Sequence, residues 1–303
     1  MTVSRNTLQS TPTPAGVVQH AVTFRSGDAE LSGTLFTPTG DGPFPGVVVT
    51  GAWTTVKEQM PGTYARELAA RGFAALAFDF TGWGASGGAP RFVEDPATKT
   101  ADIRAAAAFL AQHALVGSGG VSGLGVCASS GYMAAAVADD PNLTRLALVA
   151  PWLHDPAMAV EIYGGPDSAR ALIAASEAAR ASGAPDVLVA ASTTDESAVM
   201  YQAPYYTETD RGLIDAYDNQ FDTRSWEPWL TYDGQASADR LTAPTLMVGS
   251  DAMALPAGAK AYMDRTSAPV DALWLDDVNQ FDFYDRADIV AQVADAVSQH
   301  LGA

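Results

Sequence analysis

The sequence contains few cysteines, few histidines and few basic residues. A single cysteine among 303 residues excludes an internal disulfide and any metal site built from several cysteines. The four histidines are scattered and show no metal-ligand spacing, so we expect neither a metal nor another cofactor. No apolar run is long enough to span a bilayer, and residues 1–16 lack the apolar core of a signal peptide. These absences predict a cytoplasmic protein.

The charge balance is strongly acidic. Seventeen lysines and arginines stand against 35 aspartates and glutamates, which gives a net charge of -18. Such a chain repels phosphate backbones and anionic lipids, so we expect neither a nucleic-acid partner nor a membrane partner. Apolar residues make up 48% of the chain, enough for a large core. A small-molecule substrate is therefore the expected partner, while the oligomeric state is unreadable from the sequence.

Apolar runs typical of strands alternate with alanine-rich runs typical of helices, and no repeat is visible. This alternation predicts an α/β fold with a mostly parallel sheet and helices on both faces. We expect residues 1–16 to form a flexible tail and residues 17–151 and 240–303 to form the core. Residues 152–239 interrupt the alternation and predict an inserted helical cap. In such sheets the site lies beyond the carboxyl ends of the strands.

The segment 125–129 (GVCAS) follows a predicted buried strand and directly precedes a predicted helix. A turn of this kind holds its central residue in a strained conformation above the sheet, which makes Cys127 the candidate nucleophile. The N–H of the next residue, Ala128, would then face the same space and bind an oxyanion. Two alternatives remain: a buried and unreactive cysteine, and a register two residues later that makes Ser129 the nucleophile.

Four segments together resemble the dienelactone-hydrolase-like branch of the α/β-hydrolase superfamily. They are GAWTTVKEQMPGTYARELAARGF (51–73), AFDFTGWGASGG (77–88), EDPATKTADIRAAAAFL (94–110) and GLGVCASSGY (123–132). The resemblance implies an α/β-hydrolase fold and action on esters, lactones or thioesters. It also implies a triad of nucleophile, histidine and acid.

The same resemblance assigns roles to residues far apart in the chain. It places the catalytic acid at Asp251 and the oxyanion donors at Ala128 and at Ala52 or Trp53. Trp53 could equally be a pocket wall. The expected histidine position falls in NQFDFYD (279–285), where the chain has Gln280.

A glutamine amide cannot carry a proton at any useful pH, so Gln280 cannot act as the base of a triad. A cysteine can still attack without a base because part of it is thiolate near neutral pH, whereas activation of water is lost. His154 could replace the base from above the sheet. Asp282 and Tyr284 could act on a substrate proton, but we expect them to anchor their loop by hydrogen bonds to backbone groups.

Aromatic residues of the cap are candidates for the walls of a substrate pocket. The candidates, with neighbours from the core, are His154, Trp152, Tyr132, Tyr206, Trp226, Phe281, Tyr163, Tyr201 and Tyr205.

Three functions are compatible with these residues. The first is hydrolysis or acyl transfer through Cys127, and the second is a non-hydrolytic biosynthetic reaction (a cyclisation, lyase or pericyclic step) in the same pocket. The third is a binding protein without catalysis. The sequence also leaves open that Gln280 was introduced to trap a substrate.

Overall fold

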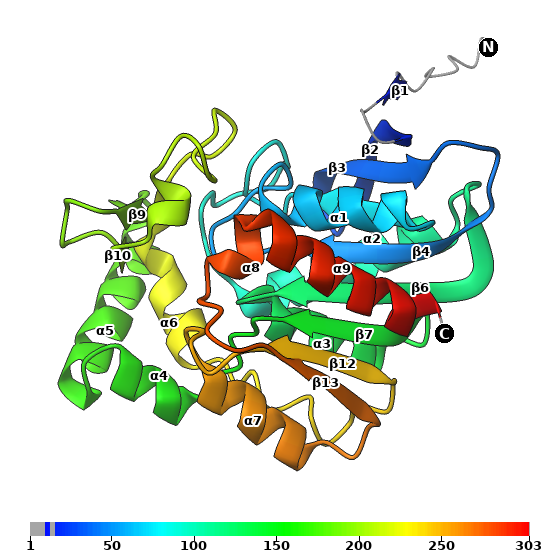
Figure 1. Cartoon of the computed structure of the whole chain (residues 1–303). Coiled ribbons are helices and arrows are strands. Elements are labelled where there is room, and N and C mark those ends of the chain that lie inside the picture. The colour runs from blue at the N-terminus through cyan, green and yellow to red at the C-terminus, as the bar shows by residue number, and fades with distance from the viewer. Residues whose placement is uncertain (1–9, 13–15, 303) are drawn as a thin grey trace, which may run out of the picture.

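One large sheet runs through the computed structural model, which describes residues 10–12 and 16–302 (Figure 1). Its nine strands lie in the order β1-β2-β3-β5-β4-β6-β7-β12-β13. They are β1 (Ser10–Pro12), β2 (Val17–Ser26), β3 (Ala29–Pro38), β4 (Phe44–Thr50), β5 (Ala74–Phe78), β6 (Val116–Val126), β7 (Leu143–Val149), β12 (Thr245–Gly249) and β13 (Val270–Trp274). The strands from β5 to β13 run parallel, and β1, β2 and β3 pair antiparallel. The expected mostly parallel sheet is confirmed.

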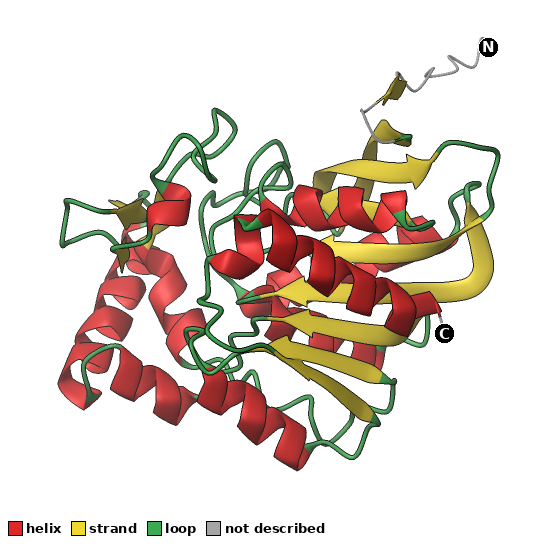
Figure 2. Ribbon diagram, in the orientation of Figure 1, coloured by secondary structure: helices red, strands yellow, loops and turns green. Residues whose placement is uncertain are grey.

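Helices cover both faces of this sheet (Figure 2). On one face lie α1 (Met60–Ala70), α8 (Asp282–Asp285) and α9 (Ala287–Gly302), and on the other lie α2 (Pro96–Ala111) and α3 (Ser129–Asp139), while α7 (Pro256–Arg265) packs against β12. Local sequence starts these helices: the Asp95 carboxylate accepts the N–H groups of Ala97 and Thr98 at 2.9 and 3.0 Å and caps α2. Among the described residues no helix is both long and apolar enough to cross a bilayer.

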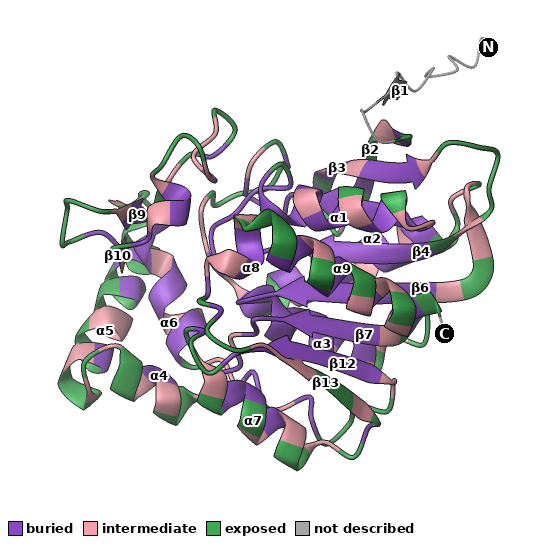
Figure 3. Ribbon diagram, viewed as in Figure 1, coloured by how far each residue is buried: buried purple, intermediate pink, exposed green. Residues whose placement is uncertain are grey.

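The central strands are buried on both faces (Figure 3). All five residues of β5 and all five of β12 are buried, as are Val47, Val48 and Val49 of β4. Continuous apolar runs are typical of parallel strands that helices cover on both sides. The two helix layers therefore leave the ends of these central strands open to a ligand.

Residues 152–239, which we call the cap, lie beyond the carboxyl ends of the strands (Figure 1). The cap contains α4 (Pro156–Ile162), α5 (Pro166–Ser182), β8 (Val187–Val189), β9 (Ala191–Ser192), β10 (Met200–Tyr201), η1 (Pro204–Tyr206), β11 (Gln220–Asp222), η2 (Thr223–Ser225) and α6 (Trp226–Leu230). Strands β8 and β11 form one small sheet, and β9 and β10 form another. The sequence predicted a helical cap. The structure differs, because short extended segments pair with one another between the helices of the cap.

The predicted flexible tail, residues 1–16, lies mostly outside the described residues, which omit 1–9 and 13–15. The described segment Ser10–Pro12 forms β1, which pairs antiparallel with β2 at the edge of the sheet. This segment at least adds to the sheet, because its backbone groups find partners on β2.

A buried ion pair fixes the loop after β4 to the loop after β5. The Asp79 carboxylate accepts the backbone N–H of Lys57 at 2.7 Å, its ammonium at 2.7 Å and the N–H of Ala85 at 2.9 Å. Gly84 lies against this carboxylate with a φ of +47°, and a Cβ there would come within 2.5 Å of it. These contacts join the segment that contains Lys57 to the segment that contains Asp79 and Gly84. They thereby hold the loop that carries Trp53 at the end of the sheet.

Strand β6 and helix α3 approach closely at Gly125. A Cβ at this position would lie 2.9 Å from the Cα of Ser130, 3.0 Å from the Cβ of Met133 and 3.0 Å from the Ser129 carbonyl oxygen. Two of these neighbours are backbone atoms and cannot turn away.

We predict that Gly125→Ala lowers the free energy of unfolding by about 1–3 kcal/mol, because the added methyl group must push α3 away from β6. Gly119→Ala on the same strand is the matched control, since a Cβ there meets no atom within 4 Å. Urea denaturation followed by circular dichroism measures both. Equal stability of the two variants would contradict the predicted close approach.

Candidate active site

Cys127 occupies the turn between β6 and α3 and has a left-handed backbone, with a φ of 56°. Its N–H donates to the Val149 carbonyl at 3.0 Å, and its own carbonyl accepts the N–H groups of Ser130 at 3.0 Å and Trp152 at 2.9 Å. These bonds hold a conformation that is rare for a residue with a side chain. The side chain is raised from the sheet into a cavity, where 8% of the residue remains exposed.

Three hydrogen-bond donors face the sulfur of Cys127. Burial raises the pKa of the thiol above its ordinary value, and the hydroxyl of Tyr284 and the N–H groups of Ala128 and Trp53 oppose that rise. The structure thus brings Ala128 and Trp53 to the candidate nucleophile, and their role as oxyanion donors stays a prediction. Ala52 lies one residue away, and it is not among the residues that line the cavity.

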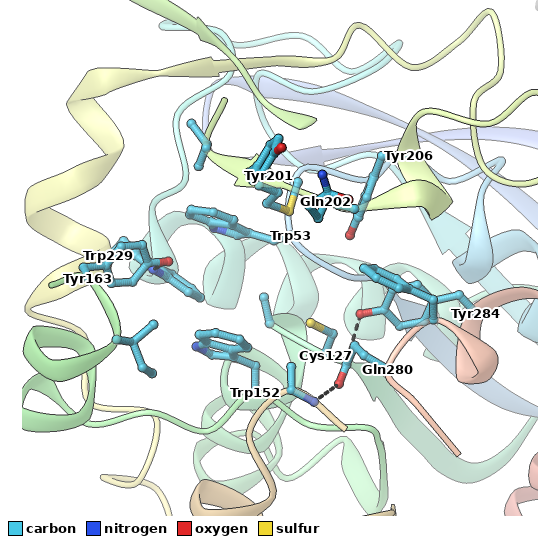
Figure 4. A pocket seen from close by; sticks show the side chains of 17 residues that line it. Trp53, Cys127, Trp152, Tyr163, Tyr201, Gln202, Tyr206, Trp229, Gln280 and Tyr284 are labelled. Atoms are coloured by element: carbon cyan, nitrogen blue, oxygen red, sulfur yellow. Dashed lines mark hydrogen bonds between the residues drawn. The ribbon is translucent and has the colours of Figure 1, made fainter. Parts of the chain in front are cut away.

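Gln280 lies beside the sulfur of Cys127, but its amide group forms hydrogen bonds to other residues (Figure 4). Its Oε1 accepts the N–H of Ala254 at 2.9 Å, while its Nε2 donates to the Ala150 carbonyl at 2.9 Å and to the Tyr284 hydroxyl oxygen at 2.8 Å. The two backbone partners fix which end of the amide is oxygen and which is nitrogen. Because the amide donates to Tyr284, the phenolic proton is free to point at Cys127.

Tyr284 does not take the loop-anchoring position that was expected of it from the sequence. From the sequence, Asp282 and Tyr284 were expected to anchor their loop, with action on a substrate proton as the alternative. Asp282 does anchor it, by accepting the N–H of Asn279 at 2.9 Å. Tyr284 instead turns inward, fully buried, towards Gln280 and Cys127. The four-residue spacing from Gln280, across the turn that opens α8, was the available signal.

Asp251 is not assembled with the other predicted residues, which contradicts its expected place in a triad. Its side chain is 73% exposed, and its carboxylate binds the ammonium of Lys260 at 2.6 Å and the indole N–H of Trp274 at 3.1 Å. The physical reason lies in the hydrogen bonds of Gln280. Its Oε1 accepts the N–H of Ala254, and an ionised carboxylate, which has no proton to donate, cannot bond to that oxygen.

His154 does not replace the missing base. It is 1% exposed and is not part of the cavity wall. The Trp152 indole donates to its Nδ1 at 2.9 Å, so its Nε2 carries the proton and donates to the Trp229 carbonyl at 3.0 Å. Burial lowers the pKa of this imidazole. Both nitrogens are therefore occupied in a neutral ring.

The Ser129 alternative also fails on geometry. Its hydroxyl is buried within the first turn of α3 and donates to the Val126 carbonyl at 3.1 Å. It does not reach the cavity wall. Cys127 is therefore the nucleophile candidate that the structure supports.

The cavity above Cys127 has a volume of about 400 Å³. Its wall comprises Trp53, Cys127, Ala128, Trp152, Ile162, Tyr163, Val199, Met200, Tyr201, Gln202, Ala203, Tyr206, Trp229, Ala254, Gln280, Phe281 and Tyr284. The predicted wall residues Trp152, Tyr206, Phe281, Tyr163 and Tyr201 belong to it, and Tyr132, Trp226, Tyr205 and His154 do not.

The excluded aromatics serve packing or anchoring instead. The Tyr132 hydroxyl donates to the buried carboxylate of Glu94 at 2.8 Å, and Trp226 packs against Trp53. Tyr205 accepts the N–H of Met60 at 3.0 Å. Their rings are too deep in the core or in the cap–core contact to meet a ligand.

The cap docks directly on the loop that carries Trp53. The Gln59 side chain donates to the Gly212 carbonyl at 2.6 Å, and the hydroxyls of Thr54 and Tyr217 lie 3.0 Å apart. Cap residues therefore help to hold the N–H of Trp53 against the sulfur. Among residues 10–12 and 16–302 no group of three or more acidic, histidine or cysteine side chains is arranged to hold a metal.

The amino-acid sequence is similar to a known family and to bacterial proteins. A sequence model of the alpha/beta hydrolase family matches residues 47–293. The uncharacterized protein YcjY of Escherichia coli K12 is 39% identical over 94 residues, which cover 31% of each chain. The uncharacterized protein PA2218 of Pseudomonas aeruginosa is 35% identical over 147 residues, which cover 48% of this chain and 39% of that protein. The matched stretches thus span about a third of the length of these relatives.

Solved structures share the fold over nearly the whole chain. The crystal structure of PA2218 superposes with a TM-score of 0.81 at 23% identity, covering 97% of this chain and 99% of that one. DcsB in complex with its substrate analogue superposes with a TM-score of 0.79 at 18% identity, covering 94% and 99%. At these identities the likeness extends to the fold alone.

We predict that Tyr284→Phe raises the pKa of Cys127 further, because the variant loses a hydrogen bond that favours the thiolate. In the unaltered chain the rate of alkylation by iodoacetamide should rise with pH and reach half its maximum above the ordinary thiol pKa. In Tyr284→Phe that midpoint should move to still higher pH.

Tyr163→Phe is the matched control, because its hydroxyl bonds the Trp229 indole at 2.8 Å and not the sulfur. A midpoint shifted equally in both variants would show that Tyr284 does not act on Cys127 specifically.

Proposed function

Because the chain belongs to the alpha/beta hydrolase family, we propose that it transfers acyl groups through a thioester formed on Cys127, starting from an ester, lactone or thioester. The observation that carries this proposal is the convergence of Ala128, Trp53 and Tyr284 on one sulfur above the sheet. Two backbone N–H groups and a phenol at a strained nucleophile are the parts needed to stabilise charge during acyl transfer. The cavity supplies the space for the acyl group.

Acylation uses the donors in two roles. The sulfur of Cys127 bonds to the carbonyl carbon while the N–H groups of Ala128 and Trp53 take up the developing oxyanion. The bond to the leaving group then breaks. The thiol proton passes to the oxygen of Tyr284 as the phenol gives its own proton to the departing alcohol or thiol, so Tyr284 ends unchanged.

Deacylation by water is the weak step. A water molecule needs a base to take its proton, and the position that would supply one holds the amide of Gln280. A thiol acceptor needs less help because part of it is thiolate near neutral pH, and an acceptor hydroxyl held in the cavity gains from its fixed position. As the acceptor bonds to the carbonyl carbon, the C–S bond of the thioester breaks and the acceptor's proton goes to the sulfur of Cys127. An acceptor group within the same molecule gives a lactone. Transfer is therefore favoured over hydrolysis.

A non-covalent function is the second candidate, and one observation favours it. Burial keeps Cys127 in its thiol form near neutral pH, and the same donors can hold a carbonyl group without a covalent step. A cyclisation, lyase or pericyclic reaction of a natural-product intermediate would use the cavity in this way. Replacement of Cys127 separates the two candidates.

We predict that incubation with a p-nitrophenyl acyl ester adds the mass of one acyl group to the protein and that Cys127→Ala abolishes this addition. Intact-protein mass spectrometry measures it. Ser129→Ala is the control and should acylate normally, because its hydroxyl is buried in α3. Acylation that persists in Cys127→Ala would contradict the covalent proposal.

We predict that Gln280→His increases ester hydrolysis by less than about tenfold. A general base is typically worth about 10²–10⁴-fold, but an imidazole without an acid to orient it loses most of that gain. Asp251 cannot orient it, since its carboxylate binds Lys260 and Trp274. A rise of about 10²-fold or more in the rate of p-nitrophenol release would show that the acid reaches residue 280 after all.

A further inference from the structure

The cavity wall offers a substrate no charged group. Among the residues that line it, the polar side chains are the thiol of Cys127, tyrosine hydroxyls, tryptophan indoles and two glutamine amides, all of them neutral when Cys127 is a thiol. Trp53 and Trp229 stack with ring centroids 4.8 Å apart and present a broad aromatic surface. An ionic group that enters such a cavity loses its hydration and finds no opposite charge to offset the free-energy cost.

The mouth of the cavity is apolar as well. Ile162 at the end of α4 and Tyr201 in β10 both line the cavity, and each is 43% exposed. Large apolar side chains at such exposure are uncommon elsewhere in the described residues, where only Val187 and Val189 match them. A ligand therefore first meets apolar surface.

The cap that surrounds this mouth is strongly acidic. Residues 152–239 contain 15 aspartates and glutamates against 4 arginines and no lysine.

The cap's positive charge, moreover, is already neutralised. Each of the four arginines contacts a carboxylate: Arg170 bonds Asp167, Arg180 bonds Glu227 at 2.6 Å, Arg211 bonds Asp285 at 2.6 Å and Arg224 bonds Asp222 at 2.5 Å. A phosphate group approaching the cap would find every described arginine there engaged and an excess of negative charge around it.

A further buried carboxylate lies behind the nucleophile. Glu94 is fully buried and forms an ion pair with Lys99 at 2.7 Å. Burial is the largest cause of the raised pKa of Cys127, and the negative charge of Glu94 also raises it.

We propose that the acyl donor is an uncharged free molecule, an ester, lactone or simple thioester with an apolar or aromatic acyl part, and that the protein discriminates against donors bearing phosphate. Coenzyme A thioesters and thioesters on an acidic carrier protein belong to the disfavoured class. This inference rests on the proposed acyl transfer through Cys127 and specifies which donors supply it. The size of the cavity, about 400 Å³, limits the part of the donor that enters.

The test offers one acyl group, phenylacetyl, on three leaving groups: phenol, N-acetylcysteamine and coenzyme A. Intact-protein mass spectrometry follows the rate at which Cys127 is acylated by each. The two thioesters have nearly the same reactive bond, so their ratio reports recognition and not intrinsic reactivity. We expect the neutral thioester to react at least about tenfold faster at low ionic strength and the gap to narrow in 0.5 M salt, about 0.5 M being enough to screen exposed charges.

A variant pair tests whether charge at the mouth causes this preference. Ile162→Lys adds a cation beside the cavity, and Ile162→Gln adds a neutral polar chain of similar reach. The ratio of coenzyme A thioester to neutral thioester rate should rise several-fold in Ile162→Lys and stay unchanged in Ile162→Gln.

The outcomes distinguish this inference from the proposed function. Equal acylation by both thioesters, or a faster reaction with coenzyme A, overturns the inference and leaves acyl transfer through Cys127 standing. Absence of acylation by all three donors overturns the proposed function and the inference with it. A preference for the neutral donor that is lost equally in both Ile162 variants overturns the electrostatic cause.

Discussion

The left-handed backbone of Cys127 is the constraint on which the rest of the site depends. An L-residue at a φ of 56° is strained, and it persists because neighbouring backbone groups hold it on both sides. The carbonyl of Cys127 accepts from Ser130 and Trp152, and its N–H reaches Val149. Gly125 lets α3 come close enough for this arrangement. Only then does the sulfur stand where the N–H groups of Ala128 and Trp53 can meet it.

Gln280, at the position where the family resemblance predicts a histidine, accounts for two features together. An imidazole can donate a proton to a carboxylate, whereas the Oε1 of Gln280 can only accept. It therefore pairs with the N–H of Ala254 and leaves Asp251 to Lys260 at the surface. The Nε2 of Gln280 donates to Tyr284 and turns the phenol proton to Cys127. Hydrogen-bond donors thus surround the sulfur of Cys127, and the described residues that line the cavity include no imidazole or carboxylate to take a proton from water.

The cap shapes the cavity and also determines the electric charge around it. Its contacts through Gly212 and Tyr217 hold the loop of Trp53 from one side, while the buried pair of Lys57 and Asp79 holds it from the other. Inside, cap aromatics complete an uncharged cavity. Outside, acidic residues of the cap outnumber its arginines, and carboxylates of the cap and of α8 form ion pairs with these arginines. The uncharged wall disfavours ionic groups of either sign, and the acidic surroundings repel anions in particular, which is consistent with the proposed neutral acyl donor.

The sequence by itself determined the mostly parallel sheet, the position of Cys127 between strand and helix, and the place of Gln280 in the loop where the resemblance predicts a histidine. These depend on local patterns: apolar runs, small residues in a turn, and spacing within one loop. Tertiary structure alone decided that Asp251 faces solvent, that His154 is enclosed by Trp152 and Trp229, and that Tyr284 meets the sulfur. Each of these outcomes depends on which distant backbone group satisfies a side chain, and spacing along the chain does not carry that information.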